Sequence, residues 1–149
     1  MPNNASLKPI LVIEDSPEDF EVLVRAFNKA EILLPLYRCR DGADALDFLF
    51  HKGRYTDDPY AIRPAIILLD LNMPGTDGYE VLREIKSNRS LFLTPVIVLS
   101  TSKSESDVKK SYEMGANSYI QKPVDMEGYV RMAKMIKSYW FECSVLPYS

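Results

Sequence analysis

The chain has 149 residues, the usual size of a single domain, and 46% of them are hydrophobic, as in ordinary soluble globular proteins. A formal net charge of −3 argues against a nucleic-acid binder that relies on a generally basic surface. No apolar stretch reaches the roughly 18 residues of a membrane-spanning helix, and the first residues lack the pattern of a secretory signal. These totals predict one cytoplasmic domain without a membrane or nucleic-acid partner.

The chain begins with a predicted strand followed by a predicted helix. Residues 9–13 form a short, solidly apolar run, which is typical of a strand buried on both faces. The run ends on two acids, after which Ser16 can cap a helix and Pro17 suits its first position. Apolar residues then recur at helical spacing up to about residue 30.

The middle of the chain repeats this alternation. Residues 36–39 form a weaker second strand, and helical spacing resumes at residues 45–50. The stretch from 51 to 64 holds a glycine, two prolines and several charges, which predicts a long surface loop. Residues 65–69 are the strongest strand candidate, and they lead directly into Asp70.

The second half of the chain completes the pattern. Helical spacing at 81–85 precedes a solid apolar run at 95–99, and a polar helix follows over 105–114. Residues 118–121 form a short fifth strand, and the last helix runs from about residue 125 to 140. Five strand-helix pairs whose strands look buried on both faces predict an α/β fold, a parallel sheet with helices on both faces.

Residues that can do ionic or hydrogen-bonding chemistry follow four of the five strands. They are Glu14 and Asp15, Asp70, Ser100 and Thr101, and Lys122. Right-handed crossovers bring the carboxyl ends of parallel strands to one edge of the sheet, so three carboxylates are expected to crowd against one ammonium. Such crowding raises the pKa of a carboxyl group. A divalent cation removes the conflict, and Mg²⁺ suits it best because it takes one or two carboxylates plus phosphate oxygens.

One segment resembles a known family. The stretch Asp70–Gly78, DLNMPGTDG, is similar to the phosphorylation loop of receiver domains, as found in chemotaxis and transcriptional response regulators. The resemblance covers about residues 8–141 and leaves 142–149 as a C-terminal tail. It implies a flavodoxin-like, doubly wound sheet of five parallel strands in the order 2-1-3-4-5.

The resemblance also implies a role for each matching residue. Asp70 would accept a phosphoryl group from a histidine kinase, and Mg²⁺ would be held by Asp15, Asp70, the backbone carbonyl of Asn72 and, through water, Glu14. Ser100 and Lys122 would bind phosphoryl oxygens, Tyr119 would switch position, and the peptide bond before Pro123 would be cis. Thr101 stands where the family usually has a smaller residue, which is expected to affect access to the phosphoryl group and its lifetime.

Three segments look like the regulators paired with cyanobacterial phytochromes: FLFHKGRYTDDPYAIRP, VLSTSKSESDVKKSYEMGANSYIQKPVD and SYWFECSVLP. The expected partner is therefore a phytochrome-type sensor histidine kinase. No effector module follows the receiver segment, so DNA binding is not expected. The apolar end of the chain, from Tyr139 to Tyr148, predicts a homodimer through the last helix, the fifth strand, the helix over 105–114 and the tail. The alternative is a tail that folds back onto its own domain.

Two other functions compete with the phosphorylated switch. The first is a receiver-fold protein that works without phosphorylation, which the filled positions argue against. The second is a hydrolase or phosphatase, which would need an acid such as a second Asp where Asn72 stands. The switch is not an enzyme acting on a separate substrate, since it would catalyse only its own phosphorylation and dephosphorylation. Cys39 and Cys143 are expected to be free thiols, and His51 a surface residue.

Overall fold

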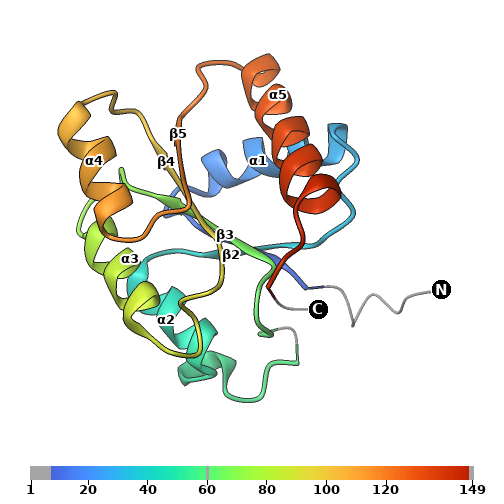
Figure 1. Ribbon diagram of the computed structural model, residues 1–149. Helices are drawn as coiled ribbons and strands as arrows, with labels where there is room; N and C mark the ends of the chain where they lie inside the picture. Colours follow the sequence, from blue (N-terminus) through green and yellow to red (C-terminus); the bar gives the residue numbers. More distant parts are fainter. Residues whose placement is uncertain (1–7, 60, 148–149) are drawn as a thin grey trace.

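The computed structural model describes residues 8–59 and 61–147. Five strands form one parallel sheet in the order β2-β1-β3-β4-β5, which confirms the predicted fold. Figure 1 shows α1 and α5 on one side of the sheet and α2, α3 and α4 on the other. The strands are β1 (Ile10–Ile13), β2 (Leu36–Cys39), β3 (Ile66–Asp70), β4 (Val96–Ser100) and β5 (Ser118–Gln121). The helices are α1 (Pro17–Lys29), α2 (Gly42–Phe50), α3 (Gly78–Ser87), α4 (Glu105–Glu113) and α5 (Met126–Ile136).

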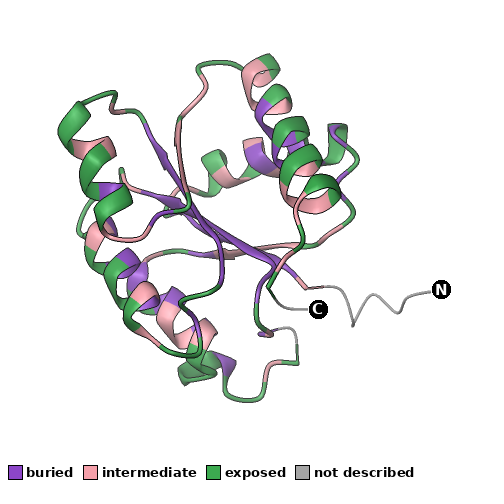
Figure 2. Cartoon of the chain, in the orientation of Figure 1, coloured by how far each residue is buried: buried purple, intermediate pink, exposed green. Residues whose placement is uncertain are grey.

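The sheet separates two hydrophobic clusters. Within β1, Leu11 and Ile13 pack into the cluster that includes residues of α2 and α3, whereas Ile10 and Val12 pack into the cluster that includes α1 and α5. Successive side chains of a strand point to opposite faces, so a continuous apolar run fills both clusters at once. Figure 2 shows the central strands buried along their length, while the outer helix surfaces are exposed.

The register of the strands brings the chemically active residues to one edge. Asp70 is the last residue of β3 and lies opposite Leu99, and Ser100 ends β4 opposite Gln121. Glu14 follows β1 directly, and its backbone N–H donates to the Cys39 carbonyl oxygen at 2.9 Å. The carboxyl ends of β1, β3, β4 and β5 therefore form one functional edge.

Side-chain caps fix where the helices begin at this edge. The Ser16 Oγ accepts from the backbone N–H of Asp19 at 3.1 Å, and Pro17 occupies the first turn, as the sequence predicts. Asp77 caps α3 in the same way by accepting from the N–H of Tyr79 at 3.0 Å. These caps stabilise helix starts next to the strand ends, where small shifts would displace the functional side chains.

The connection between α2 and β3 differs from the predicted surface loop. It contains a 3₁₀ turn, Gly53–Tyr55, whose Tyr55 is only 1% exposed. The Tyr55 hydroxyl donates to Asp44 Oδ1 at 2.9 Å, and Arg54 Nη2 lies 2.9 Å from Asp44 Oδ2. The hydrogen bond of Tyr55 and the ion pair of Arg54, both with Asp44, therefore hold the turn against α2. His51 is exposed, which confirms its predicted place at the surface.

The end of the chain differs from the predicted continuous helix to residue 140. α5 ends at Ile136, and residues 137–143 continue as a wider turn of the π type. Trp140, Phe141 and Leu146 are half-buried against the cluster of α1 and α5, while Tyr139 remains 57% exposed. Part of the tail thus packs on its own domain. Tyr148 lies outside the described residues.

Both thiols are free in the described part of the chain, as predicted, with Cys39 buried and Cys143 exposed. Among the described helices, none combines the length and the apolar character needed to cross a membrane.

Candidate functional site

Three carboxylates meet at the functional edge. Glu14, Asp15 and Asp70 can each offer one oxygen such that all three oxygens lie within 4.8 Å of one another. Glu14 and Asp70 are 3% and 2% exposed, whereas Asp15 faces solvent. Adjacent pairing of β1 and β3 is what brings the acids together, since Ile13 lies opposite Leu69 in the sheet. The structure therefore gathers the three acids that the sequence placed at strand ends.

The crowding has an electrostatic consequence. Burial, followed by the contact with the neighbouring Asp70 carboxylate, raises the pKa of Glu14 to about 8. Without a cation, one of these two buried acids is therefore poorly stabilised in its charged form. A divalent cation would compensate both carboxylates, so the residues fit such an ion. Hard oxygen ligands of this kind suit Mg²⁺ or Mn²⁺.

Lys122 supplies the positive charge at this edge. Its Nζ lies 2.8 Å from Asp70 Oδ1 and 4.0 Å from Glu14 Oε1. Burial alone would lower the pKa of Lys122, but its hydrogen bond and charge contact with Asp70 raise it, so the side chain stays charged. The backbone N–H of Lys122 donates to the Ser100 carbonyl oxygen at 2.8 Å, which fixes the lysine beside the end of β4.

The loop after β3 contacts Asp70 from the other side. The backbone N–H of Asn72 donates to Asp70 Oδ1 at 2.8 Å. The Asn72 side-chain oxygen accepts from the N–H of Thr101 at 2.9 Å, and this bond joins the β3–α3 loop to the loop after β4. Thr101 itself is exposed beside the site.

Ser100 and Tyr119 are linked through one residue. Ser100 is 2% exposed, and its Oγ accepts from the N–H of Ser102 at 3.1 Å. The Tyr119 hydroxyl donates to the carbonyl oxygen of Ser102 at 2.8 Å, which leaves the ring half-buried. The tyrosine therefore contacts the loop that begins at the Ser100 hydroxyl.

The prediction of a cis peptide bond before Pro123 is wrong. The described residues contain no cis peptide bond, so Lys122 and Pro123 are joined in the trans form. The trans form is the more stable isomer of an X–Pro bond by about 0.5–1 kcal/mol. It leaves the Lys122 Nζ within 2.8 Å of Asp70.

Two residues that sequence reasoning missed border the site. Asp107, in the first turn of α4, accepts from the hydroxyls of Ser102 at 2.7 Å and Tyr79 at 2.8 Å. Tyr79 lies 28 residues earlier, on α3. Nothing in the sequence pattern around Asp107 or Tyr79 predicts that these two residues meet, so only the fold reveals the contact.

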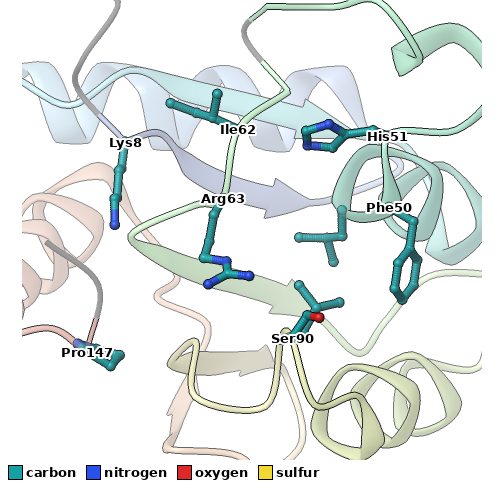
Figure 3. A pocket seen from close by; sticks show the side chains of 9 residues that line it. Lys8, Phe50, His51, Ile62, Arg63, Ser90 and Pro147 are labelled. Carbon is teal, nitrogen blue, oxygen red and sulfur yellow. The ribbon is translucent and has the colours of Figure 1, made fainter.

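A hollow lined by described residues lies at the opposite edge of the sheet. Its volume is about 890 Å³, and Figure 3 shows Lys8, His51 and Arg63 among the side chains that line it. Lys8 precedes β1 and Arg63 precedes β3, which places the hollow at the amino ends of the strands. It is therefore separate from the carboxylates, which follow the same strands.

Comparisons with known proteins agree with this geometry. Residues 10–134 match the family model described as the response regulator receiver domain. The response regulator Rcp1 of Synechocystis sp. is 42% identical over 140 residues, covering 94% of this chain and 93% of Rcp1. A crystal structure of Rcp1 in its Mn²⁺-bound form superimposes with a TM-score of 0.83 at 41% identity, over 94% of this chain and 99% of that one.

Two further solved structures are similar along nearly the whole chain. RPA3017, a response regulator in red light signalling of R. palustris, has a TM-score of 0.91 at 35% identity, over 96% of this chain and 100% of that one. The phosphorylated cyanobacterial phytochrome response regulator RcpA has a TM-score of 0.85 at 37% identity, over 95% and 99%.

Proposed function

Because this chain belongs to the response regulator receiver domain family, we propose that it accepts a phosphoryl group from a sensor histidine kinase on Asp70. The observation that carries this proposal is the buried Asp70 carboxylate, 2.8 Å from Lys122 and gathered with Glu14 and Asp15. The protein would act as a signalling switch in the cytoplasm, and it would catalyse only its own phosphorylation and dephosphorylation.

The chain's own residues would position and stabilise the transfer. A carboxylate oxygen of Asp70 attacks the phosphorus of a kinase phosphohistidine, the N–P bond breaks as the O–P bond forms, and the imidazole leaves. A bound Mg²⁺, held by Asp15, Asp70 and the Asn72 carbonyl with Glu14 acting through water, would supply positive charge to the phosphoryl oxygens. Lys122 and the Ser100 hydroxyl would hold two further oxygens.

Two residues would control the lifetime and the readout of the acyl phosphate. Thr101 is exposed beside the site, where its methyl and hydroxyl groups would narrow the approach of water and so set that lifetime. If the Ser100 hydroxyl turned toward the phosphoryl group, it would displace Ser102. The Tyr119 hydroxyl would then lose its hydrogen bond to the Ser102 carbonyl oxygen. This release would reshape the face formed by α4, β5 and α5, a local charge change read out by a two-state element.

The partner we propose is a phytochrome-type histidine kinase. Two similar proteins support this partner, since RcpA is a cyanobacterial phytochrome response regulator and RPA3017 is a response regulator in red light signalling. Both proteins are matched over almost their full length. A kinase of this class would deliver the phosphoryl group to this domain. We propose no DNA binding by the domain itself.

A homodimer through the α4–β5–α5 face and the tail, residues 142–149, is part of the same proposal. Exposed apolar side chains support it, because Met135 is 72%, Tyr139 57% and Val145 94% exposed. The test is the mass in solution at micromolar concentration, before and after phosphorylation. A mass of two chains that Tyr139→Ala reduces to one is expected, whereas a mass of one chain in both states contradicts the dimer.

Phosphorylation itself is tested with a small phosphodonor. Incubation with acetyl phosphate and Mg²⁺ should add a single phosphate to the intact mass. Asp70→Asn and omission of the metal should abolish the gain, while Asp57→Asn, an exposed acid in the loop before β3, should retain it. If the folded wild type gains no phosphate under any condition, the protein is a phosphorylation-independent interaction module instead.

A further inference from the structure

The loop between β4 and α4, residues 101–104, is tied to its surroundings through Ser102. The backbone N–H of Ser102 donates to Ser100 Oγ at 3.1 Å, and its carbonyl oxygen accepts from the Tyr119 hydroxyl at 2.8 Å. The Ser102 hydroxyl donates to Asp107 Oδ2 at 2.7 Å. One residue thus contacts the end of β4, the aromatic side chain of β5 and the first turn of α4.

Asp107 extends this connection to α3. Its Oδ1 accepts from the Tyr79 hydroxyl at 2.8 Å. Burial, followed by the contact with Asp107, raises the pKa of Tyr79 to about 12, so the hydroxyl keeps its proton. Hydrogen bonds from Ser102 and Tyr79 hold the pKa of Asp107 below its usual range. A charged carboxylate therefore joins hydroxyls from two other segments, and hydrogen bonds to an ionised acceptor are the stronger kind.

Local helix capping does not account for this arrangement. An acid at the third position of a helix commonly reaches back to the backbone N–H of the cap residue. Here Ser104 is the cap and its Oγ accepts from the N–H of Asp107, but the N–H of Ser104 donates to the Ser102 hydroxyl at 3.1 Å. The two carboxylate oxygens of Asp107 instead receive side-chain hydroxyls from outside the helix.

We infer that Asp107 is a positioning residue that holds the β4–α4 loop in its resting arrangement, through Ser102 and Tyr79, and thereby sets the affinity of the site for a phosphoryl group on Asp70. The inference rests on the proposed function and adds its regulation by residues outside the site. Turning Ser100 toward a phosphoryl group moves Ser102, and that movement stretches the bond to Asp107.

The energetic consequence follows from a two-state equilibrium. The apparent affinity for a phosphoryl group scales with the fraction of chains already in the competent arrangement. Weakening the hydrogen bonds of Asp107 raises that fraction and so tightens binding. If Asp107 served only the stability of α4, its substitution would lower the melting temperature without tightening the binding of a phosphoryl group.

The test measures binding of beryllofluoride, an analogue of the phosphoryl group, to the full chain in the presence of Mg²⁺. Asp107→Asn should lower the dissociation constant roughly five-fold, and Tyr79→Phe, which keeps the ring but removes one donor, roughly two-fold. In the double variant the two effects should not add, because both act on one carboxylate.

Ser104→Ala is the matched control. It removes the side-chain cap of α4 but leaves the contacts of Asp107 with Ser102 and Tyr79, so it should lower the melting temperature and leave the dissociation constant unchanged. Folded Asp107→Asn and Tyr79→Phe proteins with wild-type or weaker affinity would overturn the inference. Tyr79→Phe decides alone if Asp107→Asn does not fold. A wild type that takes up neither analogue nor phosphate overturns the proposed function and this inference together.

Discussion

Lys122 lies beside two buried acidic side chains, since its Nζ lies 2.8 Å from Asp70 Oδ1 and 4.0 Å from Glu14 Oε1. The lysine side chain is 12% exposed and those of the acids are 3–4% exposed, so water screens these charges poorly. In such a setting, losing one partner costs more than forming the pair gains, because the remaining charge stays buried without compensation.

Lys122→Met should therefore destabilise the metal-free protein by about 3 kcal/mol at pH 7. Urea unfolding measures the loss, and Lys103→Met, at an exposed lysine in the loop between β4 and α4, is the control that should change little. Addition of Mg²⁺ should restore part of the stability, since the cation supplies positive charge to the same carboxylates. A loss below roughly 1 kcal/mol would mean that the acids are neutralised without the lysine.

Mg²⁺ should stabilise the wild-type protein against unfolding, because the three carboxylates lie together only in the folded state. At ten times its dissociation constant, the gain in unfolding free energy is about 1.4 kcal/mol. Asp15→Asn removes an exposed ligand and should abolish most of the gain, whereas Asp57→Asn should keep it. Melting curves with Mg²⁺ and with a chelator measure this, and equal gains in both variants would place the metal elsewhere.

The two cysteines should react very differently. Burial raises the pKa of Cys39 to about 12, so its thiolate is almost absent at pH 8 and the sulfur is also shielded. Cys143 is exposed. Iodoacetamide at pH 8 should add one group to the native protein and two to the unfolded one, measured by intact mass. Cys143→Ser should take up none while folded, and uptake there would reveal opening around β2.

Tyr55→Phe should cost roughly 1–2 kcal/mol of stability, because it deletes a buried hydroxyl that donates to Asp44 at 2.9 Å. The ring contacts with Phe48 and Tyr37 would remain. Chemical unfolding measures the loss, with Tyr139→Phe, at an exposed tyrosine, as the matched control. Equal stability of the two variants would show that the hydroxyl contributes nothing to the turn.

Lys86 should make stability depend on alkaline pH. Its Nζ donates to the carbonyl oxygens of Phe92 and Thr94 and to Asn117 Oδ1, at 2.8–3.0 Å. Burial lowers its pKa to about 8 from the usual 10.5, so between these values the unfolded chain holds a proton that the folded chain has released. The contribution of Lys86 to the unfolding free energy therefore rises with pH across this window.

The measurement compares urea unfolding of the wild type and Lys86→Met at several pH values. The stability of the wild type relative to the variant should grow from pH 8 to pH 10. For Lys109→Met, an exposed lysine on α4, the difference should stay flat. A difference for Lys86 that stays constant or narrows over this range would contradict the lowered pKa.

The fold and the edge that carries the site could be predicted because both depend on local patterns. Solid apolar runs define the strands, and the residues directly after them, such as Asp70 and Lys122, must share an edge in a parallel sheet. Ser16 followed by Pro17 likewise determines the start of α1 through short-range hydrogen bonding.

The remaining features depend on contacts that no local pattern records. Tyr55 lies in a polar, proline-containing stretch, yet its ring is buried against Phe48 and Tyr37 and its hydroxyl donates to Asp44. Asp107 and Tyr79 belong to different helices and meet only once α3 and α4 are packed. The isomer before Pro123 could not be read from the sequence either, since the two forms differ by only about 0.5–1 kcal/mol and the surroundings decide.

The separation of the two edges of the sheet has an evolutionary consequence. The connection from α2 to β3 enters its strand at the amino end, away from the carboxylates. Insertions or deletions there can change the outline of the molecule without displacing Asp70. Selection for new docking partners can therefore act on that rim while the arrangement of the carboxylates at the other edge is inherited unchanged.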